Sequence, residues 1–338
     1  MMNLCQVSII IVNYNGKRFL WECLSSVYSQ TYRPIEVIVV DNASRDGSIE
    51  FIKNNFKDVV ILPQNDNLGF SAGNNIGIKN SHGRYIATLN NDTKVDKNWL
   101  SWLVGAIESQ PDIGICASKI LFLNQPGILN SAGIKIDKYS GFTWDIGFGD
   151  KGDCYNQAKY VFGACACAAL YRREMLDEIG LFDEDFFAYH EDVDLSWRAQ
   201  LSGWKCKYVP EAICYHYFSA TSKVASPLKE YLSNRNKVWL IVKNYPSPEI
   251  YYYFLTIFLA ISGYFIYSLL TGNIAAVRGK IDALLRIKEF LSKRKLIQQR
   301  RKVSFSELSS NWESRGLLSS FVGFRKFRKV NISLKDLK

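Results

Sequence analysis

Short runs of β-branched residues alternate with amphipathic stretches along the first hundred residues. The runs lie at 7–13 (VSIIIVN), 35–41 (IEVIVVD), 59–62 (VVIL) and 84–90 (RYIATLN). Continuous apolar runs of this length are typical of strands that are buried on both faces of a parallel sheet. The stretches between them have helical periodicity. The pattern therefore predicts a doubly wound α/β sheet with right-handed crossovers.

The predicted strands end on polar residues. Asn13 closes the first strand, Asp41 the second and the Asn90-Asn91-Asp92 cluster the fourth. Ligands of open α/β sheets bind outside the carboxyl ends of the strands, so we expect a nucleotide there. No G-x-G-x-x-G follows the first strand. This absence disfavours a dinucleotide-dependent oxidoreductase.

Two of these strand ends carry acids with more than one interpretation. A carboxylate at Asp41 can accept a hydrogen bond from the imide N–H of uracil or thymine, or it can cap the following helix. Asp92 is the one acid of its cluster. It either helps to bind a divalent cation that bridges a diphosphate or is a simple turn residue.

The most informative acidic cluster is Glu191-Asp192-x-Asp194, at a predicted helix start. Acids at this position are favoured by the helix dipole alone. Capping needs one acid, however, and Asp194 can pair with Arg198 one turn later. We therefore predict that Asp192 is a general base for an acceptor hydroxyl. Glu191 or Asp194 is expected to orient the acceptor or support the base.

Two further candidates lie downstream. His216 follows a predicted strand and either ligates the cation held by Asp92 or is a satisfied core histidine. Arg235 and Asn236 lie on a helical pattern. The guanidinium either clamps diphosphate oxygens or belongs to a solvated helix face.

Eight cysteines are scattered through the chain, mostly inside apolar runs, and none forms a C-x-x-C pair. This distribution favours buried, reduced thiols in the cytosol over a disulfide framework. The first 16 residues lack a basic region and a cleavage site typical of a signal peptide. We therefore expect a cytoplasmic protein.

Seven segments cover roughly residues 5–246. They are VSIIIVNYNG, VVDNASRDGS, NLGFSAGNNIGI, LNNDTKVDKNWL, GLFDEDFFAYHEDVDLSWRAQLSGW, YVPEAICYHYFSATS and YLSNRNKVWLIVKNYP. In this order they resemble the family 2 inverting glycosyltransferases, especially the rhamnosyltransferase-like branch of bacterial O-antigen, capsule and cell-wall glycan assembly. The resemblance implies the GT-A, Rossmann-like fold of nucleotide-diphospho-sugar transferases.

The resemblance also implies roles for donor-binding residues. Val12 and Tyr14 match positions that line the nucleotide base, and Asp41 matches the acid that reads it. Asn90 and Asn91 stand in the family's metal-binding D-x-D motif. Asn in place of the first Asp leaves the third residue of this motif as the main metal ligand.

The remaining matches concern the cation and the chemistry. Asp92 and His216 match the family's ligands for Mg²⁺ or Mn²⁺, and Asp192 matches its catalytic base. Arg235-Asn236 matches a motif near the donor phosphates. The implied reaction is a single in-line displacement that inverts the anomeric carbon.

The predicted organisation is a catalytic domain at 1–246, with a nucleotide-sugar half (1–115) and an acceptor half (116–246), followed by C-terminal helices at 247–338. The expected partners are a UDP- or dTDP-sugar and a lipid-linked glycan acceptor. The sequence does not indicate which sugar is transferred: rhamnose, galactose and glucose are all compatible with a pyrimidine donor.

The C-terminal region differs in charge from the rest of the chain. From Thr271 on there are 17 basic and 5 acidic residues, whereas residues 1–270 hold 25 basic and 27 acidic residues. The net charge of +10 therefore comes from this tail, which predicts an anionic partner surface.

Residues 250–270 carry no charge and are long enough to span a bilayer. Spanning would put the basic tail on the side opposite the cytosolic donor, against the positive-inside rule. We expect this stretch to re-enter or to lie in the interface, with the tail peripherally bound to the inner face of the plasma membrane. A helical hairpin packed on the catalytic domain or in a dimer is the alternative.

Two rival functions follow from the same features. One is transfer to polyprenyl phosphate itself, as in the similar dolichol-phosphate mannose synthases. The other is a basic-tailed module that binds nucleic acid or a membrane without catalysis. No recognised nucleic-acid motif accompanies the charge, so nucleic acid is not an expected partner.

Overall fold

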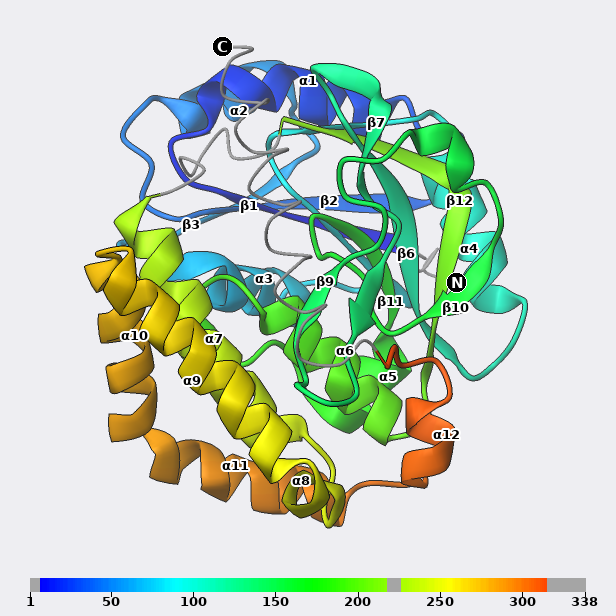
Figure 1. The fold of residues 1–338 in the computed structure, drawn as a ribbon. Helices are drawn as coiled ribbons and strands as arrows, with labels where there is room; N and C mark the ends of the chain where they lie inside the picture. The colour runs from blue at the N-terminus through cyan, green and yellow to red at the C-terminus, as the bar shows by residue number, and fades with distance from the viewer. Residues whose placement is uncertain (1–6, 218–225, 315–338) are drawn as a thin grey trace. The chain divides into compact units, whose positions relative to one another are not determined.

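A computed structural model describes residues 7–217 and 226–314 (Figure 1). The chain forms two compact units. The first comprises residues 1–134, 145–199 and 204–221, and the second comprises 135–144, 200–203 and 222–338. The boundary predicted after residue 246 therefore falls inside the second unit.

The first unit is built on the four strands that the sequence predicts. They are β1 (Val7–Asn13), β2 (Ile35–Asp41), β3 (Val60–Pro63) and β4 (Tyr85–Leu89). β1 pairs in parallel with both β2 and β4, and β2 pairs in parallel with β3. The prediction of a parallel α/β sheet is confirmed for this half.

Six further strands complete the same sheet. They are β5 (Thr93–Val95), β6 (Ile113–Phe122), β7 (Gln125–Ser131), β10 (Lys159–Val161), β11 (Ala168–Arg172) and β12 (Lys205–His216). The main order is β10-β12-β6-β11-β4-β1-β2-β3, with β5 on β12 and β7 on β6. β11 runs antiparallel to both β4 and β6, so the sheet is mixed and not parallel throughout.

Helices cover both faces of this sheet. One face packs against α1 (Lys17–Tyr28), α2 (Ser48–Asn55) and α4 (Trp99–Glu108), and the other against α3 (Gly69–Lys79), α5 (Arg173–Ile179) and α6 (Glu191–Leu201). Successive strand residues point to opposite faces. Ile9 and Ile11 accordingly join one apolar cluster, and Ile10 joins the other. Two 3₁₀ turns lie at Gly152–Cys154 and Glu184–Phe186.

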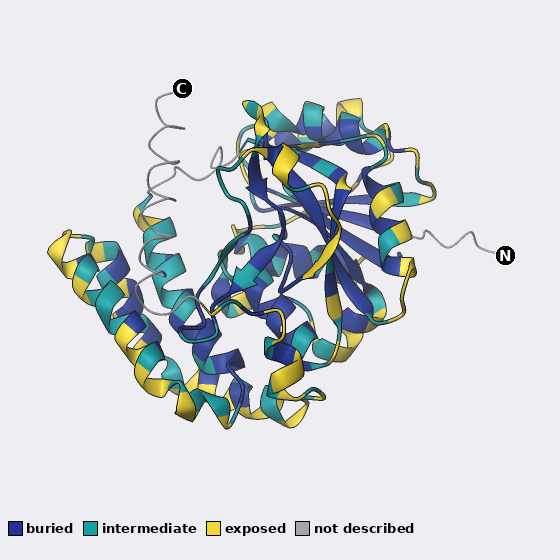
Figure 2. Ribbon diagram, turned by 45° about the vertical axis from the view of Figure 1, so that its right-hand side comes forward, coloured by how far each residue is buried: buried dark blue, intermediate teal, exposed yellow. Residues whose placement is uncertain are grey.

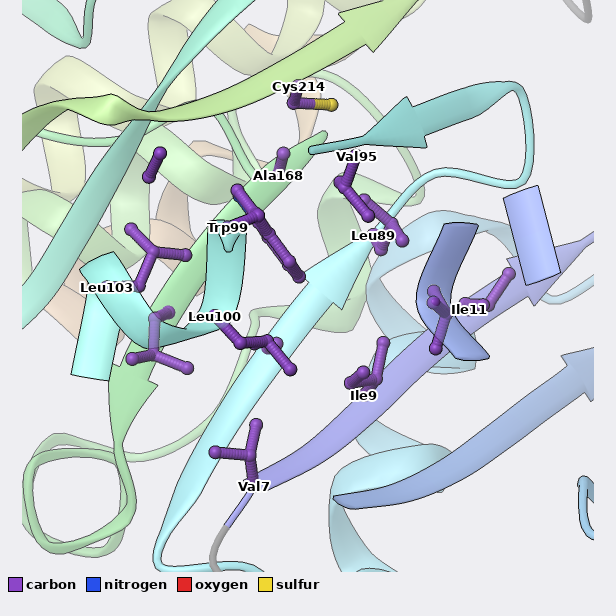
Figure 3. Packing of buried hydrophobic residues seen from close by; sticks show 14 of the residues in the cluster. Val7, Ile9, Ile11, Leu89, Val95, Trp99, Leu100, Leu103, Ala168 and Cys214 are labelled. Carbon is purple, nitrogen blue, oxygen red and sulfur yellow. The ribbon is translucent and has the colours of Figure 1, made fainter. Parts of the chain in front are cut away.

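Trp99 is the largest side chain of the first cluster (Figure 3). It is completely buried near Leu89, Val95 and Cys214, and its indole N–H donates to Ser118 Oγ at 2.8 Å. Full burial of a large apolar side chain contributes roughly 1.5–3 kcal/mol. Trp99 therefore lies near side chains from β4, β5 and β12, the strands whose ends carry the site described below.

The second unit is mainly helical. A two-stranded sheet pairs β8 (Ile134–Ile136) with β9 (Thr143–Asp145). The helices are α7 (Pro227–Asn244), α8 (Glu249–Tyr252), α9 (Phe254–Leu270), α10 (Ile274–Leu285), α11 (Ile287–Gln299) and α12 (Phe305–Ser309). The rings of Trp239 and Phe290 stack at 4.2 Å and hold α7 against α11.

The uncharged stretch 250–270 forms α8 and α9, which are separated at Tyr253. In residues 7–217 and 226–314, no helix combines the length and hydropathy required to cross a bilayer.

The seven cysteines of the described ranges are all free thiols. Five are buried, Cys165 is half-buried and Cys154 is exposed. The expectation of buried thiols is therefore wrong for Cys154.

Candidate active site

Three polar side chains form a continuous chain of hydrogen bonds across the strand ends. Strand register places Asn13 opposite Asp41, and Asn91 follows the end of β4 on the other side of β1. Asn13 Nδ2 donates to Asp41 Oδ2 at 2.8 Å, and Asn91 Nδ2 donates to Asn13 Oδ1 at 2.7 Å. The predicted convergence of polar residues at this edge is confirmed.

Asp41 also shapes the turn that follows β2. Its Oδ1 accepts the backbone N–H of Ser44 at 2.8 Å, while Asn13 Nδ2 reaches Ser44 Oγ at 3.1 Å. Helix α2 starts later, after Gly47, so Asp41 does not cap it. Asp41 is fully buried, whereas Tyr14 is 41% exposed. Contact of Asp41, Val12 and Tyr14 with a base stays a prediction.

Asp92 and His216 lie side by side. β5 pairs antiparallel with β12, which places His216 opposite Thr93, and the backbone N–H of Tyr217 donates to the carbonyl of Asp92 at 3.0 Å. His216 Nε2 is 3.3 Å from Asp92 Oδ1. The predicted proximity of these two side chains is confirmed.

Asn130 orients the imidazole. His216 Nδ1 lies 3.0 Å from Asn130 Oδ1, an acceptor that favours the proton on Nδ1. Nε2 is then turned toward the carboxylate of Asp92. Asn130 is buried at the end of β7 and was not predicted from the sequence. A hydrogen bond of this kind is common behind metal-bound histidines.

A divalent cation fits this pair. A carboxylate oxygen and an imidazole nitrogen that face each other at 3.3 Å are both lone-pair donors, and the two side chains are only 6% and 11% exposed. Within the described ranges no cluster of three or more His, Cys, Asp or Glu side chains has metal-binding geometry. Two protein ligands suit Mg²⁺ or Mn²⁺, which commonly complete their coordination with water and substrate phosphates.

The three acids of α6 differ in accessibility. Glu191 and Asp194 are buried, and Asp192 alone is half-buried. Asp192 Oδ2 accepts the backbone N–H of Ala166 at 3.1 Å, and its Oδ1 accepts that of Val193 at 2.8 Å. Asp192 is therefore the acid of this group that is best placed to reach a substrate.

The segment that holds Asp192 also holds the end of β4. Ala166 donates its N–H to Asp192, and its carbonyl accepts from Thr88 Oγ1 at 2.8 Å. The carbonyl of Cys167 accepts the N–H of Asn90 at 2.8 Å. Residues 166–167 thus link the predicted base to the Asn90-Asn91-Asp92 segment, at one edge of the sheet.

Burial sets the protonation of these acids. It raises the pKa of Asp192, although the N–H groups of Ala166 and Val193 partly oppose the shift. Burial, together with the charge of Asp192, raises the pKa of Glu191 well above its usual value. Glu191 Oε2 is buried without a hydrogen-bond partner. Because the pKa of Glu191 is raised further than that of Asp192, Glu191 is the acid of the pair that keeps its proton as the pH rises.

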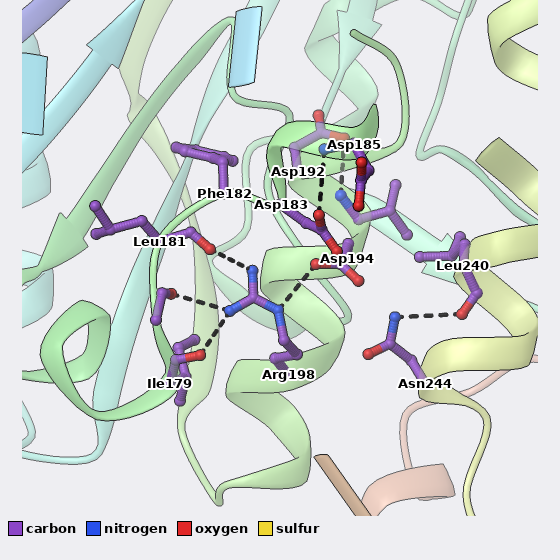
Figure 4. Close-up of polar contacts among 12 residues, drawn as sticks. Ile179, Leu181, Phe182, Asp183, Asp185, Asp192, Asp194, Arg198, Leu240 and Asn244 are labelled. Carbon is purple, nitrogen blue, oxygen red and sulfur yellow. Dashed lines mark hydrogen bonds and ion pairs between the residues drawn. The ribbon is translucent and has the colours of Figure 1, made fainter. Parts of the chain in front are cut away.

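Asp194 takes part in a structural ion pair (Figure 4). Its carboxylate lies 2.9 Å from Arg198 Nε, as the i,i+4 spacing predicts. The guanidinium also donates to the carbonyls of Ile179, Gly180 and Leu181 at 2.7–2.9 Å. Asp194 therefore ties α6 to the loop after α5, which narrows its predicted role to support of the helix that carries Asp192.

The loop before α6 is held in an uncommon conformation. Phe187, Tyr189 and His190 have φ of 63°, 70° and 69°. The carbonyl of Phe187 accepts the N–H groups of Phe70 and Ser71 at the start of α3. A Cβ at Gly69 would lie 2.5 Å from that carbonyl, so glycine is required there. Non-glycine residues with positive φ cluster at functional sites, and this conformation could not be predicted from the sequence.

Arg235 and Asn236 belong to α7 in the second unit. Arg235 Nε donates to Asn236 Oδ1 at 3.0 Å, and its guanidinium lies 4.2 Å from the centre of the Trp239 ring. Asn236 is fully buried, whereas Arg235 is half-buried. Their predicted position near the donor phosphates stays a prediction.

Residues 8–180, half of the chain, match the sequence profile described as glycosyl transferase family 2. The chain belongs to glycosyl transferase family 2. The match covers the polar strand ends, Asp92 and the segment that binds Asp192.

Curated relatives give a narrower comparison for this family 2 chain. It is 25% identical over 217 residues to poly-beta-1,6-N-acetyl-D-glucosamine synthase of Staphylococcus aureus (strain COL), covering 62% of this chain and 49% of the relative. The same enzyme of Staphylococcus epidermidis is 26% identical over 215 residues, with the same coverage. The chain thus spans about half the length of these relatives.

Solved structures share the fold. GalNAc-T7 with UDP, GalNAc and Mn²⁺ has a TM-score of 0.60 at 19% identity, covering 92% of this chain and 59% of that one. The mannosyltransferase PcManGT from Pyrobaculum calidifontis with GDP-Man and Mn²⁺ gives 0.53 at 15% identity, with 88% and 86% coverage. S. aureus TarS 1-349 in complex with UDP-GlcNAc gives 0.54 at 16% identity, with 87% and 90% coverage. The GT-A type of α/β fold is therefore confirmed.

Proposed function

We propose that this protein is an inverting glycosyltransferase that moves a hexose-type sugar from a pyrimidine nucleotide-diphosphate donor to a glycan hydroxyl. The observation that carries the proposal is the contact between Asp92 and His216 at the sheet edge where Asp192 is held. One group of side chains suits a cation and a diphosphate. A separate, half-buried carboxylate suits an alcohol.

The donor follows from the strand ends and from the family. Asn13, Asp41 and Asn91 form the floor of the proposed nucleotide site, with Val12 and Tyr14 beside the base. UDP and UDP-GlcNAc accompany two of the related folds, and the curated relatives are named as poly-beta-1,6-N-acetyl-D-glucosamine synthases. UDP-GlcNAc is therefore the first donor to test, followed by the dTDP-rhamnose that the rhamnosyltransferase-like resemblance implies.

The proposed chemistry is a single displacement. Asp192 takes the proton of the acceptor hydroxyl while that oxygen bonds to the anomeric carbon and the bond from this carbon to the diphosphate oxygen breaks. The nucleoside diphosphate leaves with the electron pair, and the anomeric configuration inverts. Asp92 and His216 would hold Mg²⁺ or Mn²⁺, which when bound neutralises charge on the diphosphate.

The geometry of the acids supports a base for this step. The N–H groups of Ala166 and Val193 hold the carboxylate of Asp192 in one orientation. Its raised pKa brings it nearer the working pH, where a base is most effective. The neighbouring Glu191 is favoured in its neutral form, so it adds no second negative charge beside the base.

We propose a hydroxyl of a lipid-linked or polymeric glycan as the acceptor. Polyprenyl phosphate itself is the rival acceptor, and it would need no general base because a phosphate oxygen is already ionised. A carboxylate positioned as a base is needed only when the acceptor is an alcohol. The position of Asp192 therefore favours a glycan hydroxyl over polyprenyl phosphate as the acceptor. Membership of family 2 favours an enzyme over a binding module without catalysis.

A donor panel tests the proposal. The full chain is incubated with UDP-GlcNAc, UDP-glucose, UDP-galactose and dTDP-rhamnose, with and without Mn²⁺ or Mg²⁺, and release of nucleoside diphosphate is measured. Metal-dependent release from one donor, stimulated by a glycan acceptor, is expected. Release that polyprenyl phosphate stimulates and glycans do not would identify the rival acceptor, and no release from any donor would contradict the proposal.

A further inference from the structure

Large apolar side chains are exposed along one side of α9. Seven residues of this 17-residue helix are between 46% and 82% exposed: Phe254, Leu255, Phe258, Leu259, Ile266, Leu269 and Leu270. The helix contains no charged residue. Isolated exposed leucines are ordinary, but a run of this size on one helix marks an interaction surface.

The spacing shows that these residues form one helical face. Phe254 and Phe258 are one turn apart, and Ile266 and Leu270 repeat the interval further along. Ile257, Ala260 and Ser268 are buried on the other side. The apolar face is therefore turned away from the core of the second unit, not toward it.

Helices α10 and α11 add basic residues to the same kind of surface. Ile274, Ile281, Leu284 and Leu285 of α10 and Leu291 and Leu296 of α11 are 45–77% exposed. Arg278, Lys288 and Lys295 are exposed between them. The one exposed acid of these helices, Glu289, is paired with Arg286. Figure 2 shows the exposed residues along these helices.

We propose that these residues of α9, α10 and α11, together called the α9–α11 face, bind the surface of a bilayer that contains anionic phospholipids. Helices with an apolar side and basic residues lie in the membrane interface, with the apolar side chains at the boundary of the acyl chains. Tyr251 and Tyr252, 75% and 79% exposed at the start of this region, match the preference of tyrosine for the headgroup level.

Charge distinguishes a membrane from the other possible occupants. A second copy would bring Arg278, Lys288 and Lys295 of each chain toward the same positive residues. The chain's own residues 315–338 contain seven basic residues and one acidic residue, so they are repelled in the same way. An anionic lipid surface attracts these cations and also accepts the apolar side chains.

Vesicle co-sedimentation of the full chain tests the inference. We expect binding to phosphatidylcholine vesicles that contain phosphatidylglycerol, weaker binding to phosphatidylcholine alone, and weakening by salt. The double substitution Phe258→Glu/Leu269→Glu is expected to lower the partition coefficient at least about tenfold, because each substitution puts a charge in the acyl boundary. Arg278→Gln and Lys288→Gln are each expected to lower it about fivefold, on anionic vesicles only.

Controls separate this surface from general stickiness and from self-association. Trp102→Glu replaces an equally exposed apolar residue of the first unit, 49% exposed, and is expected to leave vesicle binding unchanged. Equal binding by the full chain and the Phe258→Glu/Leu269→Glu variant would overturn the inference. So would a dimer in light scattering that this variant dissociates. Nucleoside diphosphate release with a soluble acceptor is measured in parallel, so that failure of the enzyme and failure of the membrane surface are told apart.

Discussion

His216 Nε2 lies 3.3 Å from Asp92 Oδ1, and the same imidazole is held from behind by Asn130 Oδ1. The three residues come from the turn after β4, the end of β12 and the end of β7. The β5–β12 pairing brings Asp92 and His216 together, and the packing of the sheet places Asn130 behind the imidazole. The arrangement gives the predicted cation site an orienting residue.

The first prediction concerns this orienting residue. Asn130→Ala removes the acceptor that favours the proton on His216 Nδ1, so the ring can turn and Nε2 no longer faces Asp92. We expect the Mn²⁺ concentration for half-maximal activity to rise about tenfold or more. Metal titration of nucleoside diphosphate release measures it. Asn54→Ala, an exposed substitution on α2, is the control. An unchanged titration in the Asn130 variant would remove Asn130 from the site.

The second prediction concerns the base. Asp192→Asn keeps the shape of the side chain but cannot take a proton, so we expect transfer to fall by about 10²–10⁴. Donor affinity, measured by calorimetry with the nucleoside diphosphate and Mn²⁺, is expected to change less than about twofold. Asp177→Asn, an exposed acid on α5, should have normal activity. Full turnover by the Asp192 variant would refute the assignment.

The ionisation of Asp192 is expected to set the pH dependence of activity. Asp192 must be ionised to act as a base, and burial raises its pKa. Activity is therefore lost as the pH falls through this raised pKa, above the usual value of about 3.9 for an aspartate. The acidic limb of kcat/KM reports this group. We expect Glu191→Gln to leave the limb in place. A limb that moves in this variant would mean that Glu191 is the titrating group.

The fourth prediction concerns stability. Glu191 has its pKa raised by burial, so above about pH 4.3 the unfolded chain releases a proton that the folded chain retains. Wild-type stability consequently falls as the pH rises toward the folded pKa. Glu191→Gln removes this loss. The free energy of unfolding of the variant in urea, relative to that of the wild type, should therefore grow by about 1.4 kcal/mol per pH unit above about pH 4.3. An advantage that is equal at about pH 5 and at about pH 8 would contradict the buried, protonated state.

The fifth prediction separates structural from catalytic acids. Asp194→Asn leaves the buried guanidinium of Arg198 without its carboxylate, and we expect a loss of about 3–5 kcal/mol in the free energy of unfolding. Asp112→Asn breaks an exposed pair with Lys205 and should cost less than about 1 kcal/mol. A raised acceptor KM in Asp194→Asn with normal stability would instead place Asp194 against the acceptor.

The sequence alone determined the first half of the fold and the edge where the site lies. The predicted strands 7–13 and 35–41 agree with the structure to the residue. A parallel strand that is buried on both faces must be a continuous apolar run, and such a run is visible in the sequence itself. Their polar ends then had to share one edge. The i,i+4 pair of Asp194 and Arg198 could also be predicted, because the spacing of side chains along a helix depends only on local geometry.

Only the tertiary structure decided which of these polar residues do what. Asn130, Ser44 and the N–H of Ala166 contact the predicted site residues through strand register and turns, which no local pattern encodes. Glu191 is buried whereas its neighbour Asp192 is half-buried, and this difference depends on how α6 packs on the sheet. The boundary of the second unit likewise depends on packing of α7 with α10 and α11. The periodicity of a sequence indicates which side of a helix or strand is apolar. Which other helix or strand packs against that side depends on contacts between residues distant in the chain.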